Sequence, residues 1–306
     1  MKFYCSLILL MLVASGCVTD ARVTQPLPFE NAQRRAIKAF ENRDLGSALA
    51  HANEALHQSR SNGYTRGVKI ARLTRANILL SLQRFREAIE ELDHLERRLE
   101  PSEQTLYLRW ALQKSRLLII QDSPGASGFI ERFLPDFNTA DMPEGQIDET
   151  VVSLIANRAK LAVEDHELDA TRWIKRFENS LNDLLNTGDG KRQHGLQALR
   201  YRLLASTAPS PDQKGSLLDQ AINAYRQARL SEGLAATLLA KANWMEQRQN
   251  GQQASNDLRR QALYIATSAG HCLLARQAAL ALGGALDTPE PGILEALPPP
   301  HLNFCG

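Results

Sequence analysis

Short segments that cannot continue a helix recur along this chain about every forty residues. In order, they are Arg43–Asp44, Gln83–Arg84, Asp122–Gly125, Asp165–His166, Ala208–Pro211 and Gln249–Gly251. Counted from the first residue of each, the successive spacings are 40, 39, 43, 43 and 41 residues. A repeat period of about 20 to 50 residues is typical of stacked supersecondary units. The spacing therefore predicts a stack of similar units.

Between these breaks the apolar residues follow helical spacing, with no credible strand alternation. The clearest stripe recurs at i, i+3, i+4 and i+7 and consists of Ala170, Trp173, Ile174, Phe177, Leu181, Leu184 and Leu185. One helix hairpin cannot bury such a stripe alone, whereas neighbours in a stack bury it between them. We therefore expect an all-α fold, an α-solenoid of about six helix hairpins.

The expected hairpins fall into two groups. Repeats 1–3 occupy residues 29–135, and repeats 4–6 with a capping helix occupy residues 150–285. Residues 136–149 interrupt the pattern and form either a loop or a boundary between two halves. Residues 286–306 form a Pro-rich tail that cannot continue a helix.

Repeats one, two and six resemble the tetratricopeptide repeat. Residues 44–56 look like its second helix, with Ala48, Ala52 and Ala55 at the small contact positions. Residues 85–89, which include Ala88, repeat that signature, and Ala76 stands where the family has a small residue in the first helix. Residues 261–280 are similar to the longer variants of this repeat. Small residues at these places let two helices approach closely.

The first seventeen residues resemble the signal of a bacterial lipoprotein. Lys2 precedes an apolar run that is too short for a transmembrane helix, which needs about 20 apolar residues. The run ends in Ala14, Ser15, Gly16 and Cys17, which resemble the lipobox. The resemblance implies removal of residues 1–16 and lipidation of Cys17, with plain secretion as the alternative. Residues 17–28 would then form a tether.

The same resemblance implies a location. Val18 follows the acylated position, where the family's inner-membrane retention signal has Asp. A lipid-anchored protein of the outer membrane that faces the periplasm is therefore expected. Because the periplasm is oxidising, Cys272 and Cys305 are candidates for a disulfide. Cys272 could instead be a small buried core residue, and Cys305 could form an intermolecular bridge.

The chain lacks three common sequence motifs for catalysis and metal or redox chemistry. The chain contains no His-Glu-x-x-His helix, no Gly-x-Ser-x-Gly elbow and no Cys-x-x-Cys pair. We therefore expect no catalytic residue, no metal site and no small-molecule cofactor. The 36 basic and 34 acidic residues nearly balance, so nothing indicates nucleic acid as a partner.

A few polar and aromatic residues are candidates for binding a partner. Arg66, Lys69 and Arg72 belong to a locally basic first third, which is either a solvated helix face or a rim for an anionic partner. Asn77 falls near a groove-lining position of a first helix, where clamp-type repeats hold peptide backbone. Trp110 lies on a helix that is apolar on two sides, and it is either exposed to a partner groove or buried between neighbours.

These features predict a binding protein, not an enzyme. We expect a periplasm-facing scaffold for envelope proteins, whose concave wall of first helices accepts a peptide or helix. Secretin pilots, parts of the barrel-assembly machine and activators of wall synthases are lipoproteins with such repeats. The alternative is an envelope enzyme, or a subunit of one, that acts on peptidoglycan or glycan.

Overall fold

The computed structural model describes residues 27–100, 102–134, 149–186, 193–248 and 251–283. In these ranges the chain forms thirteen α-helices. They are α2 (Leu27–Glu41), α3 (Leu45–Ser61), α4 (Thr65–Ser81), α5 (Phe85–Glu96), α6 (Gln104–Ile120), α7 (Ala126–Glu131), α8 (Glu149–Glu164), α9 (Ala170–Asn186), α10 (His194–Ser206), α11 (Pro211–Ala228), α12 (Ser231–Glu246), α13 (Gln252–Ser268) and α14 (Cys272–Gly283).

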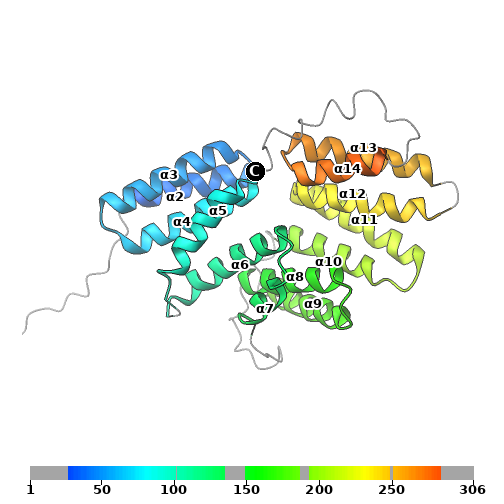
Figure 1. The fold of residues 1–306 in the computed structure, drawn as a ribbon, viewed down its shortest axis with the longest axis horizontal. Helices are drawn as coiled ribbons and strands as arrows, with labels where there is room; N and C mark the ends of the chain where they lie inside the picture. Colours follow the sequence, from blue (N-terminus) through cyan, green and yellow to red (C-terminus); the bar gives the residue numbers. More distant parts are fainter. Residues whose placement is uncertain (1–26, 101, 135–148, 187–192, 249–250, 284–306) are drawn as a thin grey trace, which may run out of the picture.

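Successive helices pack as antiparallel pairs, and the pairs follow one another along an arc (Figure 1). Helices α2–α5 form one arm of the arc, α6–α10 its middle and α11–α14 the other arm. The most extensive contacts join neighbours in sequence, such as α2 with α3, α10 with α11 and α12 with α13. The expected all-α class is confirmed, and the sequential pairing is consistent with a helical repeat array.

Four of the predicted breaks share one backbone geometry. Arg43, Gln83, Asp122 and His166 adopt the left-handed conformation, with φ between 51° and 63°. After each of them, the next backbone N–H donates to a carbonyl five residues earlier, as Arg84 does to Leu79 at 2.9 Å. Such bonds satisfy carbonyls at a helix C-terminus that have no partner inside the helix. Because these four helices end alike, residues at a fixed distance before each turn occupy equivalent places.

The small residues expected at close helix contacts are buried. Ala48, Ala52 and Ala55 in α3, Ala76 in α4 and Ala88 in α5 have no exposed surface. The apolar stripe of α9 is also buried, through Trp173, Ile174, Phe177, Leu181 and Leu184. The 3.6-residue period therefore identified the faces that pack into the core.

Aromatic rings fill the space between α6 and the short α7. The Trp110 ring stacks on Tyr107 with centroids 5.5 Å apart and meets Phe129 edge-on at 5.8 Å. The indole Nε1–H donates to the Leu92 carbonyl at 3.0 Å, so the polar end of this buried ring is satisfied. Large aromatic rings therefore fill the contact between α6 and α7.

Several predicted segments fall partly or wholly outside the described residues. These are the signal peptide 1–16, most of the tether, the interruption 136–149 apart from Glu149, and the tail 286–306. At the tether's end, α2 begins at Leu27 and takes in Pro28, because proline is tolerated in the first turn of a helix. Within the ranges given above, none of the helices combines the length and apolar character needed to cross a membrane.

Candidate binding face on the inner wall of the arc

One position recurs in successive first helices, six residues before each left-handed turn residue. Its occupants are Ile37 in α2, Asn77 in α4, Arg116 in α6 and Lys160 in α8. Arg202 in α10 follows Lys160 by 42 residues and continues the series. The repeated turn geometry therefore places a row of mostly polar and basic side chains along the array.

Hydrogen bonds join two members of this row, and residues beside it, across neighbouring helix pairs. Nη1 of Arg116 donates to Oδ1 of Asn77 at 2.7 Å and to Oε1 of Gln113 at 3.1 Å. One repeat further along, Nδ2 of Asn157 donates to Oγ of Ser115 at 3.0 Å. The two bonds of Arg116 fix the orientation of its guanidinium, and no described residue accepts a hydrogen bond from its other N–H groups.

Charged and titratable groups from distant parts of the chain act on one another electrostatically. We call them the inner wall: Arg43, Arg116, Lys160, Arg202, Glu232 and His271. Arg43 and Glu232 both act electrostatically on Arg116 and on His271, although they belong to opposite arms.

The electrostatics of the inner wall favour an anion. Burial lowers the pKa of the Arg116 guanidinium; Glu232 opposes this effect and Arg43 adds to it. Burial also lowers the pKa of Lys160; the carboxylates Glu164 and Glu232 oppose this effect, and the nearby cations Arg202 and Arg116 add to it. Lys160 has Glu164 at 3.7 Å, yet its side chain is 30% exposed. A cation that is partly desolvated but still accessible gains more from pairing with an incoming carboxylate than a fully hydrated one.

The two arms of the arc meet at the turns after α4 and α13. Nε2 of Gln83 lies 3.5 Å from Nδ1 of His271, and Sγ of Cys272 lies 2.6 Å from Oε1 of Gln83. The other ring nitrogen of His271 lies 2.9 Å from Oγ of Ser231, at the start of α12. Burial lowers the pKa of His271, Glu232 raises it, and Arg43 lowers it further. These side-chain contacts bring the two arms together at this point.

The predicted partner-binding residues lie in different surroundings. Asn77 lies in α4 and in the row described above, and its role in holding a peptide backbone stays a prediction. Lys69 and Arg72 instead form ion pairs, with Glu103 at 2.5 Å and with Glu91 at 2.6 Å. Arg66 is exposed. Trp110 is only 3% exposed, which matches the burial alternative.

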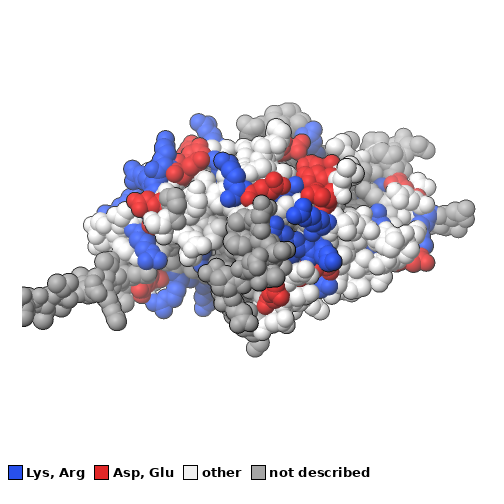
Figure 2. Space-filling view, turned by 90° about the horizontal axis from the view of Figure 1, so that it is seen from below, with Lys and Arg blue, Asp and Glu red and all other residues white. Residues whose placement is uncertain are grey.

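Part of the basic first third is balanced by acidic neighbours. Arg35 pairs with Glu54 at 2.7 Å, and Arg34 approaches Glu30 at 4.0 Å. Figure 2 shows acidic side chains interspersed with the basic ones over this arm. This pairing agrees with a solvated helix face for these residues. The disulfide between Cys272 and Cys305 stays a prediction, because Cys305 lies outside the described residues.

Sequence reasoning missed the basic members of the inner wall. Arg116, Lys160 and Arg202 follow Asn77 at steps of 39, 44 and 42 residues, close to the repeat period. Counting back six residues from Asp122 and Ala208 would have found Arg116 and Arg202, and the same count from His166 gives Lys160. Among the described residues, no group of three or more His, Cys, Asp and Glu side chains is placed to hold a metal ion.

Comparison with known proteins adds no family to this description. Neither the protein-family models nor the curated proteins gave a match to this chain.

Proposed function

We propose that this protein is an α-solenoid scaffold of tetratricopeptide-like repeats that binds an acidic segment of an envelope protein on its inner wall. One observation carries the proposal: the position six residues before successive left-handed turn residues holds Asn77, Arg116 and Lys160, Arg202 continues the series, and Arg116 is hydrogen-bonded to Asn77. Arg43 adds a fourth cation that acts electrostatically on Arg116. The carboxylates that act on these cations are Glu164 and Glu232. Among the described residues, the positive charges named here exceed the negative ones, which favours an acidic partner.

Chemically, the row of first-helix side chains suits an extended peptide. Guanidinium groups bind carboxylates through paired, charge-assisted hydrogen bonds, and Lys160 adds a mobile ammonium. The amide of Asn77 can donate to a backbone carbonyl of the bound segment while its oxygen accepts from Arg116. Carboxylate side chains would give the interaction its specificity, and the amide would hold the main chain.

The proposed place of action is the periplasmic face of the outer membrane. The lipobox-like residues that end in Cys17 support this part of the proposal. The lipid would confine the scaffold and its partner to one surface, which raises their effective concentration without any new contact.

Charge-neutral variants test the binding face. In one variant Lys160→Gln and Arg202→Gln remove two cations of the inner wall. The matched control carries Arg172→Gln and Lys175→Gln, two exposed residues of α9 for which no ion pair is found among the described residues. Both variants lose one arginine and one lysine, so their net charges are equal.

Two measurements compare the variants. In cells, cross-linking followed by mass spectrometry identifies envelope proteins that the control retains and the inner-wall variant loses. In vitro, fluorescence anisotropy with a labelled hexaglutamate peptide should show binding that weakens by about tenfold or more in the inner-wall variant. Equal loss of binding in both variants, or no loss in either, would contradict an inner-wall site.

A further inference from the structure

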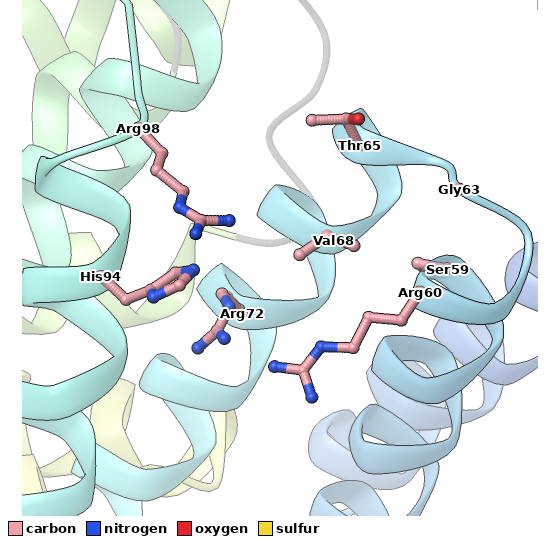
Figure 3. Close-up of a pocket in the computed structure, with 8 residues that line it drawn as sticks. All are labelled: Ser59, Arg60, Gly63, Thr65, Val68, Arg72, His94 and Arg98. Carbon is pink, nitrogen blue, oxygen red and sulfur yellow. The ribbon is translucent and has the colours of Figure 1, made fainter.

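A second basic cluster lies away from the inner wall, in a cavity of about 400 Å³ between the α3–α4 turn and the end of α5. Figure 3 shows Arg72 on α4 close to His94 and Arg98 from the α5 side, with Arg60 reaching toward them from α3. Thr65, the first residue of α4, also lines the cavity. Three guanidinium groups and an imidazole thus surround one space.

The positive charge of this cavity is not neutralised within the described residues. Arg72 donates to Glu91 at 2.6 Å, but the same carboxylate also accepts from Arg75. Arg60 and Arg98 form no ion pair with any described residue, although both line the cavity. Like charges repel, so such a cluster is costly unless an anion joins it.

Two buried polar atoms at the cavity also lack a hydrogen-bond partner among the described residues. They are Nε of Arg72, a residue that is 9% exposed, and Nε2 of His94. Buried polar groups are normally paired, and each unpaired one calls for a ligand or water. Burial lowers the pKa of His94, the charges of Arg72, Arg98 and Arg97 lower it further, and Glu91 opposes them, so an anion in the cavity would offset part of this shift.

The start of α4 adds further positive potential. Tyr64, the residue before α4, makes no side-chain hydrogen bond to the first helical turn. The first backbone N–H groups of a helix have no partner inside it, and together with the helix dipole they attract anions. The hydroxyl of Thr65 provides one more donor at this point.

We propose that this cavity is a binding site for a phosphate-type oxyanion, held by Arg60, Arg72 and Arg98 together with His94. Guanidinium groups match the oxygen geometry of phosphate, and several of them can share one tetrahedral anion. A volume of about 400 Å³ exceeds what an inorganic ion fills and has room for the group that carries the phosphate. That group is either a lipid headgroup or a small soluble molecule, and both present the same anion.

Titration calorimetry on the full chain distinguishes the two sources. The probes are inorganic phosphate and dihexanoylphosphatidylglycerol, a water-soluble anionic lipid, at constant ionic strength. Binding of phosphate alone assigns a soluble ligand, and binding of the lipid alone assigns a headgroup. Absence of binding for both probes overturns the proposal.

Neighbouring arginines provide a matched control for the site. Arg97 and Arg98 are both exposed and adjacent in sequence, but only Arg98 lines the cavity. We expect Arg98→Gln or Arg60→Gln to weaken binding by about tenfold or more, and Arg97→Gln to change it less than twofold. Equal effects of Arg97→Gln and Arg98→Gln would show attraction by general charge and would overturn a specific site. Neither Arg60 nor Arg98 forms an ion pair with a described residue, so these variants are expected to fold.

Discussion

Replacing Gly67 by alanine tests the packing between α3 and α4. A Cβ atom at this position would lie 2.1 Å from Cδ1 of Tyr64 and 2.8 Å from Oγ of Ser59. The Tyr64 side chain is buried, and its ring meets Phe29 edge-on with centroids 5.4 Å apart. The substitution therefore forces the Tyr64 ring out of a packed position.

Two opposing effects decide the sign of the change in stability. Alanine in place of glycine inside a helix is favourable by up to about 1 kcal/mol. Displacing a buried aromatic side chain costs about 1.5 to 3 kcal/mol of burial and a further 0.5 to 1.5 kcal/mol of ring contact. Partial repacking recovers some of that cost, so we expect Gly67→Ala to lower the free energy of unfolding by about 1 to 3 kcal/mol.

The assay is urea denaturation followed by far-ultraviolet circular dichroism, with hydrogen exchange of the α4 amides as a local readout. Gly46→Ala in α3 is the matched control, because the nearest atom to its Cβ would be Oδ1 of Asp44 at 3.8 Å. This control should be neutral or more stable than the wild type. If Gly67→Ala is also neutral or stabilising, the inference that the Tyr64 ring packs closely against Gly67 is refuted.

Four further outcomes are expected. Ala88→Phe should lower the free energy of unfolding by about 1 to 3 kcal/mol through overpacking, because Ala88 has no exposed surface. An unchanged urea midpoint would mean that the helix contact at Ala88 is loosely packed. The hydrogen bond that Lys69 donates lowers the pKa of the Glu103 carboxyl below 4.5. The Lys69–Glu103 pair therefore stabilises the fold above that pH, and its contribution is lost as the pH falls through the lowered pKa. The stability deficit of Glu103→Gln should accordingly shrink between pH 6 and pH 3 in denaturation curves, and a constant deficit would argue against the pair. Cys17→Ser should move the protein from the membrane to the soluble fraction, and continued anchoring of this variant would refute lipidation. Cys272 and Cys305 should resist alkylation in protein isolated without reductant, whereas two reactive thiols would refute the disulfide.

The sequence predicted the helix ends well because they depend on local backbone chemistry. A left-handed residue at Gln83 or His166 ends its helix through bonds to carbonyls within the same helix, and the surrounding polar residues mark the place. The small residues at the helix contacts could also be predicted from the sequence, since Ala48 and Ala88 recur at the same distance after a break. Predicting such features does not require knowing which distant segments pack together.

The candidate site was only partly predictable, because its members meet through the stacking of several repeats. Asn77 could be placed on a first helix from its own repeat. Its partner Arg116 is 39 residues away and could be identified only by aligning two repeats whose residues otherwise differ. The meeting of Gln83 with His271, 188 residues apart, depends on the curvature accumulated over the whole array, and no local pattern encodes it.

The two basic sites depend on the fold in different ways. The cavity is lined by residues that lie between Ser59 and Arg98, on three consecutive helices and the turns that follow them. The inner wall extends from Arg43 to His271 and needs every intervening pair in its place. Because each pair in a repeat array contacts mainly its neighbours, a distortion in the middle pairs leaves the cavity intact but changes the distance between the arms. Binding at the inner wall is therefore sensitive to packing defects anywhere along the array, whereas anion binding in the cavity reports only on the first two pairs.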